Sequence, residues 1–205
     1  MSSDLLLGQD SVRRCWWCGD DSVYIEYHDN EWGMPVKNDQ RLFEKMCLEG
    51  FQAGLSWITI LKKREAFRDN FQDFDFHKVA RFRPATVERL LKDARIVRHR
   101  GKIESTINNA NRAIEMIDEF GSLGAFFWQF EPRRSPIIRK REEVQATTEE
   151  STALSKALKK RGWSFVGPTT CYAMMQAMGL VNDHLRTCAA WKQVDQARKG
   201  FIRPK

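Results

Sequence analysis

The rest of the chain is organised around the stretch Leu48-Glu-Gly-Phe-Gln-Ala-Gly-Leu-Ser-Trp57. It contains a carboxylate, Glu49, within an otherwise apolar helical run. A buried, unpaired charge is strongly unfavourable, so Glu49 needs a partner. Trp57 lies eight residues on, and Gly50 and Gly54 thin the surface between the two side chains. A carboxylate and an indole beside such a surface suit a flat cation. The alternative is that Glu49 faces solvent or pairs with a nearby Lys, and that Trp57 belongs to the core.

The length and composition of the chain indicate one substantial domain, which could consist of two small lobes. The chain has 205 residues, of which 42% are hydrophobic. A net charge of +7 and a pI near 9.3 favour an anionic partner, but do not separate nucleic acid from a membrane surface. No apolar run approaches the ~18 residues of a membrane span. Five Cys without an export signal indicate reduced thiols or metal ligands in the cytoplasm.

Hydrophobic periodicity predicts an all-α chain. Residues 1–13 are interpreted as a flexible N-terminal tail, 14–33 as an ordered coil, and 192–205 as a basic C-terminal tail. The folded domain between the tails spans 14–191. Its segment 131–150 is basic and aperiodic, which is typical of a connecting loop. Helices are predicted over about 40–54, 56–67, 84–93, 103–120, 122–130, 151–160 and 168–179.

A basic turn between two of these helices predicts a helix-hairpin-helix arrangement. The turn carries Arg95, Arg98, Arg100, Gly101 and Lys102. We expect Gly101 to let the backbone turn tightly, so that the N–H groups opening the second helix face an anion. The alternative is a basic turn that only faces water.

Histidines and cysteines near the two ends of the chain could hold a metal ion. His184 and Cys188 are four residues apart, which places them on one face of a helical turn. A pair from the other end, such as Cys15 and His28, would complete four tetrahedral zinc ligands. Cys18 could replace His28, because Cys15-x2-Cys18 also has metal-binding spacing. The alternative is ordinary buried thiols and imidazoles. A zinc deaminase is excluded, because its His-x-Glu and Pro-Cys-x-x-Cys pattern is missing.

Taken together, these stretches resemble the bacterial DNA-3-methyladenine glycosylase I family from about Arg14 to Cys188. The matching blocks are Arg14-Cys15-x-Trp17, Tyr24-Ile-x-Tyr-His-Asp-Asn-Glu-Trp-Gly33, Leu48-Glu-Gly-x-Gln-Ala-Gly-Leu-Ser-Trp57, Ile96-x-Arg-His-Arg-Gly-Lys-Ile103, Phe165-Val-Gly and Met175-Gln-Ala-x-Gly-Leu-Val-Asn-Asp-His184.

The resemblance implies the fold of the helix-hairpin-helix DNA glycosylase superfamily, with two helical lobes, a base pocket between them, and termini clasped by zinc. The resemblance implies that Glu49 is the carboxylate that contacts the base and the catalytic residue. It also implies that Leu55 is the apolar residue that probes DNA. The DNA-binding hairpin residues are then Arg98, Arg100, Gly101 and Lys102. The implied ligands of one structural Zn²⁺ are Cys15, His28, His184 and Cys188, and the implied base pocket is Trp17, Tyr24, Tyr27, Trp32, Glu49 and Trp57.

The implied activity is hydrolytic removal of 3-methyladenine from double-stranded DNA in base-excision repair, by a monomer in the cytoplasm. The nucleotide must first rotate out of the duplex. The cationic base would then stack on Trp57 and face Glu49. Because it leaves as a neutral molecule, its glycosidic bond is already weak, and no strong general base is expected. Two other readings stay open: a zinc-clasped module that binds damaged DNA without catalysis, and a nucleotide-binding enzyme that uses the same aromatic pocket.

Overall fold

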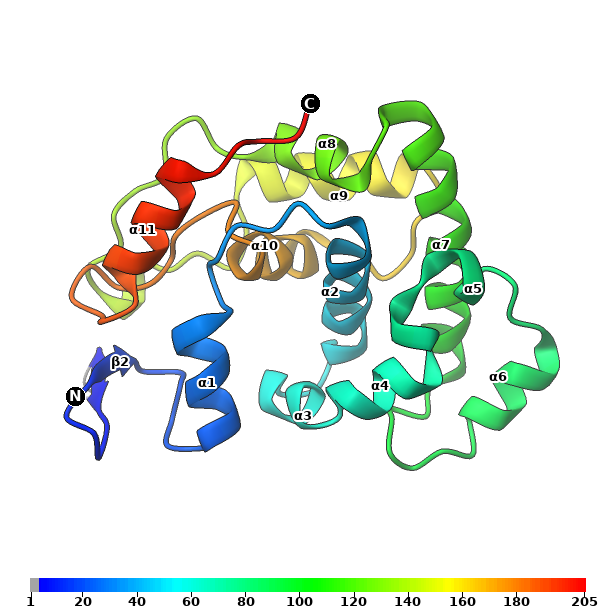
Figure 1. Ribbon diagram of the computed structural model, residues 1–205, viewed down its shortest axis with the longest axis horizontal. Helices are drawn as coiled ribbons and strands as arrows, with labels where there is room; N and C mark the ends of the chain where they lie inside the picture. The colour runs from blue at the N-terminus through cyan, green and yellow to red at the C-terminus, as the bar shows by residue number, and fades with distance from the viewer. Residues whose placement is uncertain (1–3) are drawn as a thin grey trace.

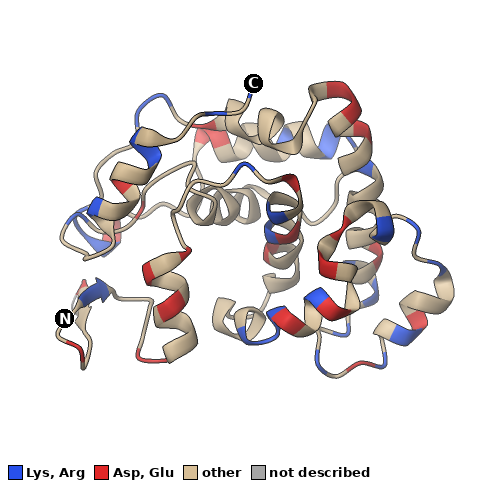
Figure 2. Cartoon of the chain, viewed as in Figure 1, with Lys and Arg blue, Asp and Glu red and all other residues tan. Residues whose placement is uncertain are grey.

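Helix α2 (Asp39–Gln52) stands at the centre of the computed structural model, which describes residues 4–205 (Figure 1). Asn38 caps its start, with the side-chain oxygen accepting from the Arg41 backbone N–H at 2.9 Å. The helix ends where Gly54 adopts a φ of 83°, in the left-handed region that glycine favours. The helix predicted over 40–54 is therefore confirmed, with Glu49 in its last turn. Charged residues of both signs alternate along it (Figure 2).

The other elements are mostly short helices, so the all-α prediction is confirmed for the bulk of the chain. The hairpin is formed by α6 and the long α7, and α9 packs on α10. The element bounds are β1 Leu5–Leu7, β2 Arg13–Cys15, α1 Ser22–Asn30, α3 Trp57–Lys62, α4 Arg64–Asn70, η1 Gln72–Phe74, α5 Phe76–Val79, α6 Pro84–Leu90, α7 Arg100–Phe120, α8 Leu123–Phe127, η2 Trp128–Phe130, η3 Arg141–Glu143, α9 Glu149–Lys160, α10 Pro168–Ala177 and α11 Trp191–Gly200.

Two hydrophobic clusters divide the molecule. The larger one is built on α2, α7 and α10 and contains most of the phenylalanines. The smaller one joins Cys15 near the N-terminus to Ile138, Leu185 and Cys188. Figure 1 shows the N-terminal strands, α1 and α11 together on one side of the molecule, and α4 to α7 on the other. This division agrees with the expectation of two lobes.

Three segments differ from the sequence predictions. Residues 5–13 are not a loose tail, because Leu5–Leu7 pairs antiparallel with Arg13–Cys15. The stretch expected as coil contains α1, whose first turn is capped by Asp21. The basic segment 192–205 is largely helix α11, and Arg203 in its last residues donates two hydrogen bonds to Glu131. Residues 1–3 of the expected tail lie outside the described residues.

The helix predicted over 56–67 is broken into α3 and α4. The break falls at Lys63, whose ammonium donates to the carbonyls of Ala94 and Arg95 at 3.0 Å each. These hydrogen bonds to a distant segment accompany a break in the helix at a position where the hydrophobic pattern alone predicts that it continues. Across the described residues, no helix is long and apolar enough to cross a membrane.

Candidate active site and metal centre

An aromatic cavity of ≈ 210 Å³ lies where the two hydrophobic clusters meet. The structure brings all six predicted pocket residues to its wall, although their contact with a base stays a prediction. Sequence reasoning missed Trp16, Gln52, Gln176 and Asp183, which also line it. The complete wall is Trp16, Trp17, Tyr24, Tyr27, Trp32, Glu49, Gln52, Trp57, Val144, Ala173, Gln176 and Asp183.

Glu49 is buried, with 6% of its surface exposed, and it is paired. Its Oε1 lies 2.7 Å from Nζ of Lys45, one helical turn earlier on α2. The alternative of a nearby Lys partner is therefore confirmed, although Glu49 also lines the cavity. Oε2 has no hydrogen-bond partner among residues 4–205. A base on the cavity side could therefore bind this second oxygen while Lys45 keeps the first.

Lys45 is the charged residue that sequence reasoning missed at this site. Its ammonium donates to the Tyr27 hydroxyl at 2.7 Å and lies 3.3 Å from the centroid of the Trp57 ring. Burial lowers the pKa of Lys45, against the opposing effect of Glu49. The spacing of four residues between Lys45 and Glu49 was the available signal, because such side chains meet on one helix face.

A second carboxylate, Asp183, also lines the cavity. Its Oδ2 accepts from the Tyr172 hydroxyl at 2.7 Å and from the Gln176 amide at 2.8 Å. Both donors come from α10, which therefore fixes the carboxylate in place. Asp183 therefore presents a fixed hydrogen-bond acceptor to the cavity.

The predicted DNA-probing residue lies on the surface. Leu55 is 43% exposed in the turn between α2 and α3. Phe165, which is 41% exposed with a φ of 56°, lies across the end of α2, where Gly50 leaves room for it. A side chain rarely adopts this φ, so local bonding must hold Phe165 there. The carbonyl of Ser164 accepts hydrogen bonds from Ser105 and Asn109 of α7.

The hairpin differs from the prediction in the roles of two residues. Lys102 is buried, and its ammonium donates to the carbonyls of Phe51 and Ala53 at 2.9 and 2.6 Å, so it cannot reach a phosphate as expected. These bonds satisfy the last carbonyls of α2 instead. Gly101 lies in the first turn of α7, with no positive φ, so it does not make the tight turn that we expected.

Arg98 and Arg100 remain on the surface at the start of α7. Arg98 has no partner among the described residues, whereas Arg100 Nη2 pairs with Glu88 Oε1 at 2.7 Å. His99 caps the helix, its Nδ1 accepting from the Lys102 N–H at 3.2 Å. No described residue accepts from the N–H groups of Arg100 and Gly101 at this helix terminus. This end of α7 therefore offers two backbone donors and the Arg98 guanidinium to an anion, whereas Arg100 would first exchange its pairs with Glu88 and Glu104.

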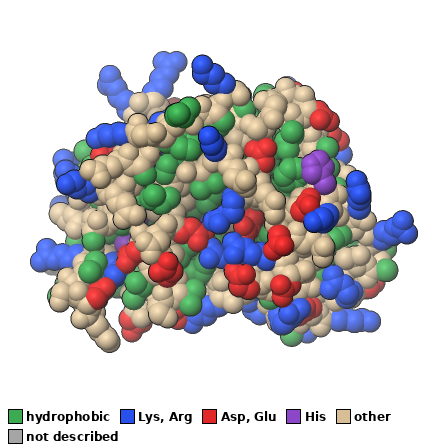
Figure 3. Space-filling view, viewed as in Figure 1, with side chains coloured by type: hydrophobic (Ala, Val, Ile, Leu, Met, Phe, Trp, Pro, Cys, Tyr) green, Lys and Arg blue, Asp and Glu red, His purple; other side chains and the backbone are tan. Residues whose placement is uncertain are grey.

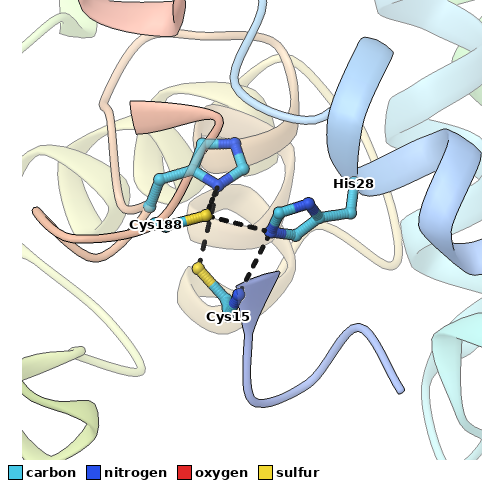
Figure 4. Close-up of side chains that lie close together, drawn as sticks. Cys15, His28 and Cys188 are labelled. Carbon is cyan, nitrogen blue, oxygen red and sulfur yellow. Dashed lines mark hydrogen bonds between the residues drawn. The ribbon is translucent and has the colours of Figure 1, made fainter. Parts of the chain in front are cut away.

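The four predicted metal ligands converge at the junction of the chain ends, and Figure 4 shows Cys15, His28 and Cys188 pointing toward one another. Ligand atoms of Cys15, His28, His184 and Cys188 all lie within 4.8 Å of one another, and all four side chains are buried. Cys188 Sγ lies 3.5 Å from His28 Nε2 and 3.7 Å from His184 Nδ1. Tetrahedral zinc places sulfur and nitrogen ligands about 3.5 Å apart. The cluster could therefore hold a metal ion, and Cys18 is not part of it.

Both imidazoles of this cluster are oriented by groups behind them. His28 Nδ1 donates to Asp29 Oδ1 at 2.7 Å, and His184 Nε2 donates to the carbonyl of Trp32 at 3.0 Å. Arg14 in turn donates to both oxygens of Asp29. Partners of this kind fix the ring nitrogen that faces a metal. The Cys2His2 arrangement is thus preformed.

The two sulfurs of the cluster influence each other. Interaction with Cys188, followed by burial, raises the pKa of the Cys15 thiol. Interaction with Cys15 lowers the pKa of Cys188, and hydrogen bonds to the two imidazoles act in the same direction. A bound dication would stabilise both sulfurs as thiolates. The donor set therefore fits a metal such as zinc.

Comparison with known proteins agrees with this geometry. The profile of the methyladenine glycosylase family matches residues 17–191. DNA-3-methyladenine glycosylase 1 of Escherichia coli (strain K12) is 50% identical over 182 residues, covering 88% of this chain and 97% of that protein. DNA-3-methyladenine glycosylase of Haemophilus influenzae is 48% identical over 178 residues, covering 85% and 96%.

Comparison with solved structures also finds similarity to 3-methyladenine DNA glycosylase I. A crystal structure of 3-methyladenine DNA glycosylase I superposes with a TM-score of 0.82 at 49% identity, covering 86% of this chain and 98% of the other. A Staphylococcus aureus structure, described as the basis of 3-methyladenine recognition by that enzyme, has a TM-score of 0.80 at 36% identity, covering 83% and 92%. The resemblance inferred from the sequence motifs is confirmed.

Proposed function

This chain belongs to the methyladenine glycosylase family, and from that premise we propose that it removes 3-methyladenine from DNA in base-excision repair. The reaction is hydrolysis of the N-glycosyl bond, which leaves an abasic site. The observation that carries the proposal is the cavity in which Glu49 and Trp57 meet a ring of aromatic side chains. A flipped purine matches the flat aromatic walls, and the cavity side of Glu49 can accept a hydrogen bond from it.

The duplex would lie across the surface that holds Leu55, Phe165 and the start of α7. Arg98 and Arg100, with the free N–H groups of that helix terminus, would bind backbone phosphates. Leu55 would enter the stack that the flipped nucleotide vacates. The turn before α3 carries Leu55, while Glu49 lies in the last turn of α2, so the probing residue is at the edge of the base pocket.

Inside the cavity, Glu49 Oε2 would accept from the exocyclic amine of the base, and the ring would stack against Trp57. Water then attacks C1′ as the glycosidic bond breaks. The bonding electron pair stays with the base, which cancels its positive charge, and the water proton passes to solvent. Lys45 pairs with one oxygen of Glu49, and donors of α10 hold one oxygen of Asp183, so we take both wall carboxylates to orient the base rather than to abstract a proton. The chemistry therefore depends on a leaving group that is already labile.

We propose that the Cys2His2 cluster binds one structural Zn²⁺. Four protein ligands leave no open position for substrate, which is typical of structural zinc. The cluster also supports the pocket, because the His28 ring lies 5.0 Å from Trp17 and the His184 ring 4.7 Å from Trp32. Zinc would link the N-terminal and C-terminal segments and restrict the motion of the aromatic side chains at the cavity wall. We further propose that the protein acts as a monomer on double-stranded DNA in the cytoplasm, since one chain supplies the whole cavity.

The direct test is incubation of the protein with methylated duplex DNA, followed by chromatography of the released bases. We expect free 3-methyladenine from the wild-type protein and a lower rate from Glu49→Gln, which keeps the shape of the side chain and removes its charge. Absence of any released base from a folded, DNA-binding wild-type protein would instead favour a damage-binding module without catalysis.

A further inference from the structure

Lys45 places a positive charge at the same two groups that would bind a cationic base. Its ammonium contacts Glu49 Oε1 and the Tyr27 hydroxyl at 2.7 Å each, and the Trp57 ring centroid at 3.3 Å. Lys45 is 4% exposed and does not line the cavity. The ammonium therefore lies behind the cavity wall, in contact with a carboxylate, a hydroxyl and an aromatic face.

This arrangement changes the charge that a base meets. An isolated Glu49 would present a negative charge to the cavity, whereas the ion pair with Lys45 has no net charge. A cationic base would share the carboxylate and the indole with a second cation a few ångströms away. Repulsion between charges so close in a site with little water weakens binding by a factor on the order of ten or more. A neutral base would not experience this repulsion.

The surrounding charges do not cancel this effect. Glu31 is the other carboxylate that acts on Lys45, and it is already engaged by Arg64 at 2.7 Å and Arg41 at 3.0 Å. Figure 3 shows that acidic and basic side chains are similarly intermingled on the face in view. Lys45 is thus the cation that acts directly on Glu49, and burial limits the screening of this pair by solvent.

We propose that Lys45 is a specificity-determining residue, whose ammonium is a resident cation that sets how strongly the pocket prefers a cationic base over a neutral one. It keeps Glu49 paired when no base is bound, so that the carboxylate does not capture any flat cation. It also leaves the pocket without net charge once the product has become neutral, which favours its release. This proposal rests on the proposed function, because it takes the cavity to be the base site.

Titration calorimetry near neutral pH can measure this preference with two small probes. The probes are 3,9-dimethyladeninium, a permanent cation, and 9-methyladenine, its neutral counterpart. The variants are Lys45→Met, which keeps the length without the charge, and Lys45→Gln, which keeps a donor without the charge. Lys62→Met is the matched control, because Lys62 is exposed on α3 and pairs with Asp21 outside the cavity.

We expect both Lys45 variants to raise the ratio of cation affinity to neutral-base affinity about tenfold or more, while Lys62→Met leaves it unchanged. A merely structural role would weaken the two probes alike. The proposal is overturned if the ratio is unchanged or falls in the variants, or if neither variant unfolds cooperatively. Failure of the proposed function would look different, since the wild-type protein would release no 3-methyladenine from methylated DNA whatever this ratio is.

Discussion

At the scale of single residues, Cys15 and Cys188 meet two histidines across the junction of the chain ends, with all four ligand atoms within 4.8 Å of one another. We expect about one zinc per chain on metal analysis of the purified protein. Cys188→Ser should lose the metal and lower the melting temperature, because removing structural zinc removes folding free energy. Cys18→Ser should keep the metal, since Cys18 is not in the cluster. Loss of zinc in Cys18→Ser but not in His28→Ala would show that the ligand set is wrong.

The three tyrosines give a second prediction at this scale. Burial is the main cause that raises the pKa of Tyr24 to about 12, and it also raises the pKa of Tyr27 and Tyr172 above their ordinary value. A pKa that is higher in the folded protein than in the unfolded chain contributes stability below about pH 10, and this stability is lost as pH rises toward the folded value.

We therefore expect the free energy of unfolding to fall as pH rises above about 10. Ultraviolet titration of phenolate absorbance should detect no tyrosine with a midpoint near 10 in the folded protein. The same titration in guanidinium chloride is the control, and there all three tyrosines should ionise together. A tyrosine of the folded protein that ionises near its ordinary pKa would contradict the described burial.

The sequence and the resemblance placed Glu49 and the aromatic side chains at the cavity wall, but their roles stay predictions. The prediction failed where side-chain direction decided, as at Lys102. Position along the sequence could not show that the amine of Lys102 turns inward to the carbonyls at the end of α2. That contact joins segments far apart in the chain, and a basic run gives no sign of it. Lys45 could have been predicted, because a lysine one helical turn before a buried carboxylate is its simplest partner.

At the scale of elements, the start of α7 is expected to bind phosphate through Arg98 and Arg100. Replacing either with Ala should weaken binding to all duplexes alike. The slope of log binding constant against log salt concentration should become shallower by up to about one. Lys102→Met is the contrasting variant. It should lower the melting temperature, since two carbonyls of α2 lose their donor, and leave the salt slope unchanged. If a variant with both Arg98→Ala and Arg100→Ala had the same salt slope as the wild type, this surface would only face water.

The helices with a clear apolar stripe were the ones that the sequence predicted well. Helix α2 has such a stripe together with an Asn38 cap, and α7 has one over six turns. Helix α1 lacks this pattern, because its Tyr24 and Tyr27 face a cavity rather than a core. The strand Leu5–Leu7 depends on backbone pairing with Arg13–Cys15. Pairing between such short strands leaves little trace in side-chain periodicity.

At the scale of the whole molecule, the cavity exists because two hydrophobic clusters meet without merging. The larger cluster positions Glu49 and Trp57, and the smaller one joins the chain ends and positions Trp17. The sequence alone could place neither cluster, since the smaller one combines Cys15 with Leu185 across almost the entire chain. Resemblance to a known family supplied this arrangement, and the Cys2His2 cluster, which could hold a metal ion, lies at the junction of the chain ends.

The central claim is that binding of a labile, cationic base replaces strong acid–base chemistry. It is tested most directly by single-turnover excision from two duplexes that differ only in the damaged base, one with 3-methyladenine and the other with hypoxanthine. The neutral hypoxanthine needs an activation that the paired carboxylates Glu49 and Asp183 do not offer. We predict ready release of 3-methyladenine, and no hypoxanthine above the level seen in buffer. Efficient release of hypoxanthine by the wild-type protein would contradict the claim.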